Sequence, residues 1–183
     1  LRSTVTRSLV ESTIVPMSVR FTSLSAQDLP AIVDHLLALP SDDRVLRFNT
    51  TAPDDKIVEY CRHWKHDADI AEGAWNGTRL VGLIHLPVFA VGPDLVGELG
   101  VSVDPAWRQR QIATRLAQRT FDRCAERGVA RVYVNFLTRN RPMLCLARRF
   151  TTDIVQDGDE TVAKIRIAPA PNAAAAPSLH ADA

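Results

Sequence analysis

The chain has 183 residues, the length of one domain, and 46% of them are hydrophobic and 23% charged, which is typical of a globular protein. Its net charge of +1 excludes a strong attraction of the whole molecule to nucleic acid or to an anionic membrane. Nearly all basic residues are arginine, a side chain that makes planar, bidentate contacts with phosphate and carboxylate groups.

The cysteines and the chain ends suggest a cytoplasmic protein with one folded domain. Cys61, Cys124 and Cys145 lack the spacing of a metal site, so we expect reduced thiols, with Cys124 and Cys145 on apolar helix faces. The chain contains no apolar run near the roughly 20 residues of a membrane span, and its start lacks the apolar region of a secretory signal. We expect an N-terminal extension, one domain and a disordered Ala- and Pro-rich tail, over residues 1–16, 17–168 and 169–183.

In the first third of the chain, one strand precedes three helices. Alternation of apolar and polar residues predicts a strand over Val19–Leu24. Ser25, with Asp28 three positions later, resembles a capping box and opens the first helix. We expect Ser41 to cap the second helix and Pro53 to lie in the first turn of the third. These helices are predicted over residues 25–39, 41–48 and 53–66.

The rest of the chain alternates strands and helices. Three antiparallel strands, joined by turns at Asn76-Gly77 and at Gly92-Pro93-Asp94, are predicted over residues 69–75, 79–91 and 95–103. A helix, a buried strand, a second helix and a final hairpin follow over residues 110–127, 129–137, 140–150 and 152–167. The strand–helix–strand unit within 95–137 implies one parallel strand pair. The pattern therefore predicts an α/β (α+β) fold, with a mixed, mostly antiparallel sheet of about six to seven strands flanked by helices.

The most informative segment is the turn between the strand that ends near Val103 and the helix that follows. A turn that leads into a helix presents free backbone N–H groups and the positive end of the helix dipole, and this combination binds phosphate. Arg108 and Arg110 add positive charge at the same place. The alternative is an ordinary arginine-rich helix start on a solvated surface, because short motifs often match by chance.

Several motifs in the chain resemble those of the GNAT superfamily of N-acyltransferases. The run Arg108-Gln109-Arg110-Gln111-Ile112-Ala113 is similar to the acyl-CoA pyrophosphate loop R/Q-x-x-G-x-G/A, with Gln111 where the family has a glycine that lets backbone and phosphate approach closely. The element order over residues 19–167 is also that of the family. Three further segments resemble the GNAT domain of bacterial protein-lysine acetyltransferases, and they lie at residues 39–48, 98–103 and 140–150.

The resemblance implies a GNAT fold with a splayed parallel strand pair, acetyl-CoA as the cosubstrate, and an amine, such as a protein lysine, as the acceptor. Relatives commonly form homodimers. By resemblance, the loop binds the pyrophosphate, the strand before it binds the pantetheine arm, and an asparagine contacts that arm from the other side. The implied cofactor-binding residues are Val101, Ser102, Val103, Arg108, Gln109, Arg110, Gln111, Ile112, Ala113, Thr114 and Asn140.

Acetyl transfer to an amine requires a neutral nitrogen, yet a lysine amine has an ordinary pKa near ~10.4, so some group must accept its proton. Glu98, which the resemblance places beside the acyl group, is the candidate base, acting directly or through water. The alternative for Glu98 is an outward-facing side chain on a solvated strand. The tyrosine with which many relatives protonate the departing thiolate is replaced by Ala147, and Thr151-Thr152 replace a common Gly-Phe.

Two other functions stay open at this point. Gln111 and Thr151-Thr152 would suit a non-catalytic domain that binds acyl-CoA for regulation, and an acidic acceptor pocket would suit a small-molecule amine acetyltransferase. We expect no nucleic-acid or membrane partner. His63 and His66 have no third ligand at suitable spacing, so we predict no metal site, and we expect His85 to be a hydrogen-bonded core histidine.

Overall fold

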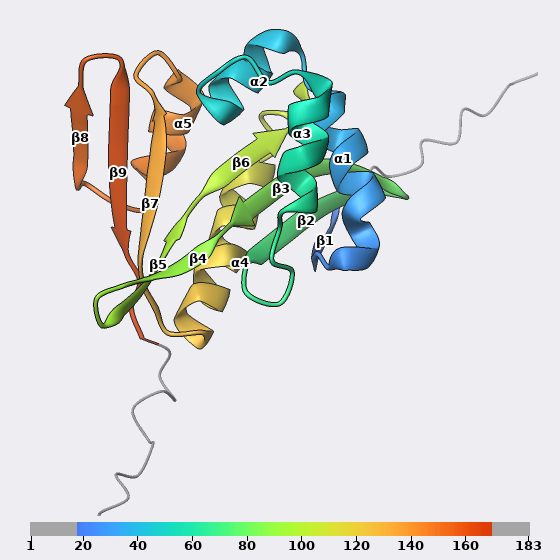
Figure 1. Cartoon of the computed structure of the whole chain (residues 1–183). Helices are drawn as coiled ribbons and strands as arrows, with labels where there is room; N and C mark the ends of the chain where they lie inside the picture. The colour runs from blue at the N-terminus through green and yellow to red at the C-terminus, as the bar shows by residue number, and fades with distance from the viewer. Residues whose placement is uncertain (1–17, 170–183) are drawn as a thin grey trace, which may run out of the picture.

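The computed structural model describes residues 18–169, which form five helices and nine strands in two sheets (Figure 1). The extension expected over residues 1–16 and nearly all of the tail expected over 169–183 lie outside the described residues. The first sheet has the order β1-β2-β3-β6 and comprises Arg20–Ser23, Ile70–Asn76, Arg79–Leu86 and Gly100–Val103. The second has the order β4-β5-β7-β9-β8 and comprises Val88–Val91, Asp94–Glu98, Val129–Leu137, Glu160–Arg166 and Ile154–Asp157. The helices α1 to α5 are Leu29–Leu37, Ser41–Phe48, Asp54–Arg62, Ile112–Glu126 and Arg141–Ala147.

The two long strands expected in the middle of the chain are each divided between the two sheets. Pro87 separates β3 from β4, because proline has no N–H to donate to a ladder. Leu99 separates β5, which pairs with β7 in parallel, from β6, which pairs with β3 antiparallel. The Leu99 N–H still donates to Tyr133 O at 2.8 Å, and beyond it β6 leaves β7. The predicted fold class and its parallel pair are confirmed, and these two breaks raise the strand number to nine.

The helix starts differ in detail from the prediction. The capping box is present, since Asp28 Oδ2 accepts from the Ser25 N–H at 2.8 Å, but it opens a 3₁₀ turn that leads into α1. The expected cap at Ser41 is wrong: Pro40 takes the N-cap position and makes no side-chain cap bond. Pro53 likewise lies just before α3 rather than in its first turn. This helix ends at Arg62, earlier than predicted, and the following turn is held by Asp69 Oδ2, which accepts from the Lys65 N–H at 2.9 Å.

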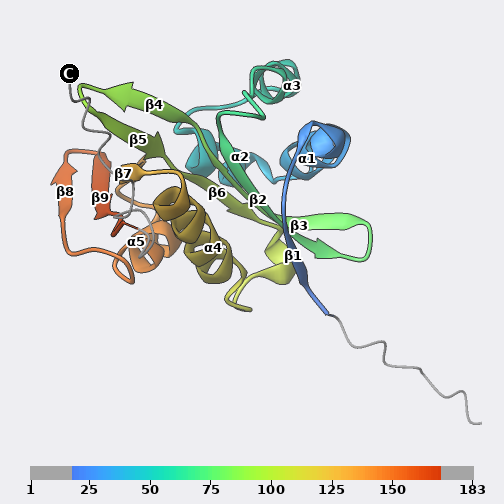
Figure 2. The ribbon, with the colours of Figure 1, turned by 90° about the horizontal axis from the view of Figure 1, so that it is seen from below.

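The sheets lie between two layers of helices, with α1, α2 and α3 on one side and α4 and α5 on the other (Figure 2). The predicted apolar face of α4 is buried against the strands, and it consists of Ile112, Leu116, Ala117, Phe121 and Cys124. A second core between α1, α3 and the β2–β3 hairpin contains Ile32, Leu36, Ile57 and Leu83. Within the described residues, helices of the length and apolarity that a membrane span requires do not occur.

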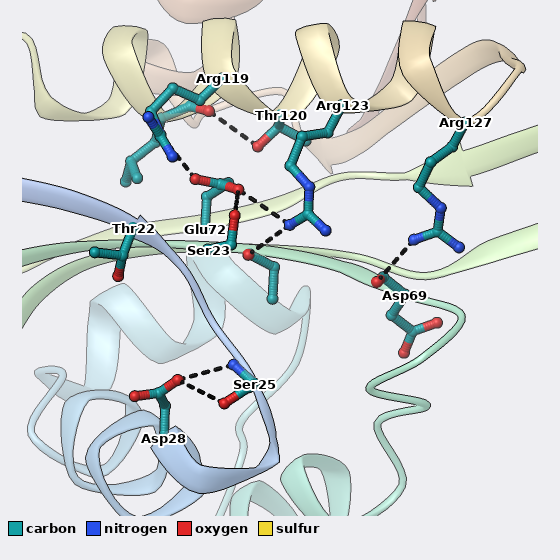
Figure 3. A network of polar contacts seen from close by, with 12 residues as sticks. Thr22, Ser23, Ser25, Asp28, Asp69, Glu72, Arg119, Thr120, Arg123 and Arg127 are labelled. Carbon is teal, nitrogen blue, oxygen red and sulfur yellow. Dashed lines mark hydrogen bonds and ion pairs between the residues drawn. The ribbon is translucent and has the colours of Figure 1, made fainter.

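A buried polar cluster holds α4 to the first sheet (Figure 3). The fully buried Glu72 of β2 accepts hydrogen bonds from Ser23 Oγ at 2.7 Å, from Arg119 Nε at 2.8 Å and from Arg123 Nη1 at 3.1 Å. One turn later, Arg127 donates to the carbonyl oxygens of Asp69 and Ala68. A buried carboxylate is tolerated only when it is paired and hydrogen-bonded. This cluster therefore fixes the helix whose N-terminus opens at the candidate site.

Candidate functional site

A cavity of about 810 Å³ lies where β5 and β6 part, between α2, the N-terminus of α4, β7 and α5. Nearly all of the residues that the sequence indicated line this cavity. They are Glu98, Val101, Ser102, Val103, Arg108, Gln109, Gln111, Ile112, Ala113, Thr114 and Asn140. Arg110 does not line it, and its guanidinium lies over the Trp107 ring, 4.9 Å from the ring centroid.

The loop before α4 presents unsatisfied backbone donors to the cavity. Gln111 is the N-cap of α4, and its carbonyl accepts the first helical hydrogen bond, from the Arg115 N–H at 3.0 Å. The N–H groups of residues 112–114 therefore have no acceptor within the helix, and the positive end of the dipole of a 15-residue helix lies at the same place. Such an arrangement binds phosphate groups.

Gln111 and Gln109 both have left-handed backbone conformations, with φ of 57° and 60°. This region favours glycine, because a Cβ there approaches the following carbonyl oxygen at a cost of roughly 1–2 kcal/mol. The Gln111 side chain itself is exposed. The glycine of the pyrophosphate pattern is thus explained here by the backbone conformation at position 111.

Arg108 of the loop is held by α2. Its Nη2 donates to Asp43 Oδ2 at 2.7 Å, and its Nε donates to Val103 O at 3.2 Å. Asp43 lies in the first turn of α2, where a negative charge favours the helix dipole. The same carboxylate therefore also neutralises Arg108 of the loop.

Asn140 joins two elements that flank the cavity. Its Oδ1 accepts from the Met143 N–H at 3.2 Å, so Asn140 is the N-cap of α5. Its Nδ2 donates to Leu46 O of α2 at 3.4 Å. The side chain is buried; one end of its amide caps α5 and the other joins α5 to α2.

Ser102 directs its buried hydroxyl toward α1, away from the neighbouring valines. The hydroxyl lies 2.8 Å from His35 Nε2, and the other ring nitrogen of His35 lies 3.1 Å from Leu80 O. Because a carbonyl only accepts, His35 Nδ1 carries the proton and Nε2 accepts from Ser102. Burial lowers the pKa of His35 to about 4, so this histidine is neutral at pH 7.

Glu98 is the last residue of β5 and is exposed at the wall of the cavity. Its Oε1 accepts from Asn135 Nδ2 of β7 at 2.9 Å. The side chain is therefore solvated, as the second alternative expects, and it lines the cavity, where a base would have to lie.

Sequence reasoning missed a group of side chains from α2, α3 and β3 at the same cavity. As predicted, His85 is a buried, hydrogen-bonded histidine: its Nδ1 lies 2.7 Å from Tyr60 Oη and its Nε2 lies 3.0 Å from Asp69 Oδ2. It stacks on Trp64 with ring centroids 3.7 Å apart, and burial lowers its pKa. Arg47 Nη2 donates to Tyr60 Oη at 2.9 Å. No local pattern could place these residues together, since α2 and α3 meet β3 only in the tertiary structure.

The cysteines are free thiols, and Cys61 and Cys124 are buried. The expectation that Cys145 lies on an apolar helix face is wrong, because it is exposed and lines the cavity. The short helix α5 buries only Ala147 and packs Met143 and Leu144 partly, which leaves Cys145 on its other face. Across residues 18–169, no group of three His, Cys, Asp or Glu side chains is arranged to hold a metal ion.

Comparisons with known proteins agree with this geometry. The model of the acetyltransferase (GNAT) family matches residues 34–151. The structure of the GNAT domain of S. lividans PAT is 15% identical, covers 81% of this chain and 90% of its own, and gives a TM-score of 0.68. A PaiA N-acetyltransferase from Thermoplasma acidophilum, solved with coenzyme A, is 13% identical over 82% and 99% of the two chains, with a TM-score of 0.59. A spermidine N-acetyltransferase from Vibrio cholerae, solved with CoA and spermine, is 16% identical over 81% and 95%, with a TM-score of 0.62. A comparison with curated protein sequences found no match.

Proposed function

Because the chain belongs to the acetyltransferase (GNAT) family, whose members use acetyl-CoA as cosubstrate, we propose that it transfers the acetyl group of acetyl-CoA to an amine. One observation carries the proposal: the free amides at the start of α4 open into the cavity that forms where β5 and β6 part. An anion-binding helix end and an opening between strands are the two features that an extended acyl-CoA requires.

The cofactor half of the cavity comprises the loop, the start of α4 and β6. We assign the pyrophosphate to the amides of residues 109–114, with Arg108 and Arg110 supplying positive charge. The backbone of residues 101–103 would hold the pantetheine arm on one side, with Asn140 on the other. Since Arg108 is paired with Asp43, binding a diphosphate would place Asp43 beside an anion, and that ion pair would have to loosen.

The chemical step is assigned to Glu98. Asn135 holds one of its carboxylate oxygens, and within residues 18–169 the other oxygen accepts no hydrogen bond. Glu98 would accept the proton of the amine, directly or through water, as the nitrogen forms a bond to the acyl carbon and the carbon–sulfur bond breaks. The buried Ala147 cannot act as an acid. The thiolate would therefore take its proton from water or from protonated Glu98.

The identity of the amine belongs to the same proposal. The segments at residues 39–48, 98–103 and 140–150 favour a protein lysine, because they resemble those of protein-lysine acetyltransferases. The likeness to a spermidine N-acetyltransferase makes small amines the second class to test. We also propose a cytoplasmic location, since the described cysteines are unpaired thiols.

A thiol-release assay tests the proposal. Acetyl-CoA is incubated with the protein and a panel of polyamines, aminoglycosides, amino acids and lysine peptides, while CoA binding is measured by isothermal titration. Glu98→Gln should lower turnover by about 100- to 10,000-fold and leave acetyl-CoA binding unchanged, because a positioned base contributes that much. The matched control is Glu160→Gln, which changes an exposed carboxylate outside the cavity.

Two results would contradict it. Full turnover by Glu98→Gln would show that Glu98 is not the base. Tight CoA binding without thiol release on any acceptor would favour a non-catalytic regulatory domain, the alternative that the strained Gln111 supports.

A further inference from the structure

Arg47 of α2 lines the cavity and lies over Gly100 of β6. Its guanidinium packs so closely on Gly100 that a Cβ at that position would overlap it. Gly100 pairs with His85 across the β3–β6 ladder, so Arg47 lies directly above the strand pair that forms this wall. Only a glycine at position 100 leaves room for the guanidinium.

Within the part of the chain that the structure describes, no carboxylate neutralises the positive charge of Arg47. Among the eight ion pairs found in residues 18–169, none includes Arg47, and its only hydrogen bond is the one that Nη2 donates to Tyr60 Oη. Its Nε is buried without a partner. The guanidinium lies over the rings of Phe48 and Tyr60, with centroids at 4.9 and 5.6 Å. An unsatisfied buried donor on a cation is costly, so a ligand that fills it is bound strongly.

The hydrogen bonds behind Arg47 fix its orientation. Because the Asp69 carboxylate only accepts, His85 Nε2 donates to it, and Nδ1 of the neutral ring accepts from the Tyr60 O–H, whose oxygen accepts from Arg47 Nη2. The carboxylate of Asp69 is thus separated from Arg47 by two neutral groups. The chain Asp69–His85–Tyr60 holds the guanidinium in place without neutralising it.

We propose that Arg47 binds a carboxylate that the acceptor carries close to its reacting amine, an inference that rests on the acetyl transfer proposed above. Glu98 and Gly100 both line the cavity, one on each side of Leu99, at the point where β5 and β6 part. An acceptor can therefore direct its amine to Glu98 and its carboxylate to the fork of Arg47, which matches carboxylate geometry. A polyamine, with only positive groups, is disfavoured.

The carboxylate has two sources, a free amino acid or an acidic residue beside a lysine in a peptide. The test compares kcat/KM for thiol release from acetyl-CoA with matched pairs: amino acids against their amides, and peptides with Lys next to Glu against Lys next to Gln. The protein should favour the carboxylate member by about 10- to 100-fold in at least one kind of pair, the effect of one charged hydrogen-bonded contact. Arg47→Gln should abolish this ratio and Arg47→Lys should keep part of it. Arg62→Gln, an exposed arginine of α3 outside the cavity, should keep all of it.

A binding readout separates this inference from the proposed function. In ¹⁵N-labelled protein saturated with CoA, the Arg47 Nε–H resonance, identified by its loss in Arg47→Lys, should shift with the carboxylate probes and not with their amides. Thiol release without preference for carboxylates and without this shift would overturn the inference and leave acetyl transfer standing. The shift without thiol release on any acceptor would overturn acetyl transfer and keep the carboxylate site. A change in KM for acetyl-CoA alone in Arg47→Gln would place Arg47 on the cofactor and overturn the assignment.

Discussion

Arginine serves two different purposes on the two sides of the sheet. On the α4 side, Arg119 and Arg123 converge on the fully buried carboxylate of Glu72 (Figure 3). On the α2 side, Arg47 meets aromatic rings, a tyrosine and a glycine, and the described part of the chain offers it no carboxylate. The first arrangement is complete and holds a helix in place. The second is incomplete and faces a cavity, so the difference separates a structural cluster from a binding site.

Removing Glu72 should break the complete cluster with the largest loss of stability. Glu72→Ala leaves Ser23 and two arginines without their shared acceptor. We expect the free energy of unfolding to fall by about 3 kcal/mol in urea denaturation, the low end for a broken buried pair, because the arginine side chains are 43% and 31% exposed and water can solvate them. Glu59→Gln, which breaks an exposed ion pair with Lys56, is the control and should change nothing measurable. Equal stability of the two variants would show that the cluster does not hold α4.

His35 should make stability depend on pH. Its folded pKa of about 4 lies below its ordinary value of 6.5, so the unfolded chain binds more protons between these pH values. The contribution is therefore complete above pH 6.5 and is lost as the pH falls to 4, by about 3 kcal/mol. Denaturation at several pH values tests this. Over this pH window, His35→Asn should lose less stability than the unaltered protein. The control His63→Asn, which changes an exposed histidine, should lose as much stability as the unaltered protein. Parallel curves for all three would contradict a buried, neutral His35.

The Arg108–Asp43 pair is intermediate between the two cases. A carboxylate of the protein neutralises this arginine, yet the pair belongs to the loop that carries the free amides. Arg108→Ala should weaken CoA binding by about 10- to 100-fold in isothermal titration, the loss of one charged contact to phosphate. Asp43→Asn should strengthen binding, since it removes an anion that competes for Arg108. Unchanged affinity in both variants would show that Arg108 serves only to hold α2.

Gln111→Gly should have the smallest effect. Relief of the left-handed conformation should raise the free energy of unfolding by about 1 kcal/mol, seen as a higher Tm, with CoA affinity unchanged or stronger. Gln118→Gly, in the middle of α4, is the control and should lower the Tm, because glycine destabilises a helix interior. A lower Tm for Gln111→Gly would mean that the Gln111 side chain stabilises the loop.

The sequence predicted what depends on local pattern. The apolar stripe of α4, the parallel pair around it and the loop before its N-terminus follow from spacing along the chain. The structure brings the predicted loop residues, except Arg110, to one cavity. Pro87 could have indicated that the strand over residues 79–91 is divided, since proline interrupts a ladder. The break at Leu99 carries no such signal, because it depends on which neighbouring strand each half pairs with.

The polar partners were beyond local pattern. Glu72 meets Arg119 and Arg123 across about fifty residues, and Arg47, Tyr60 and His85 come from three elements. From sequence alone, a glutamate in a strand or an arginine in a helix is expected to be exposed, and only the tertiary structure shows whether it is buried. Arg47 lies in a segment that the sequence analysis noted only for its resemblance. The requirement for glycine at position 100 follows only from the tertiary structure, in which Arg47 packs on it.

A crystal structure with coenzyme A tests the central claim most directly. The account predicts the pyrophosphate against the backbone amides of residues 112–114, the pantetheine arm between β6 and α5, and the sulfur end directed toward Glu98. Coenzyme bound elsewhere, or those amides occupied by a side chain of the protein, would contradict it.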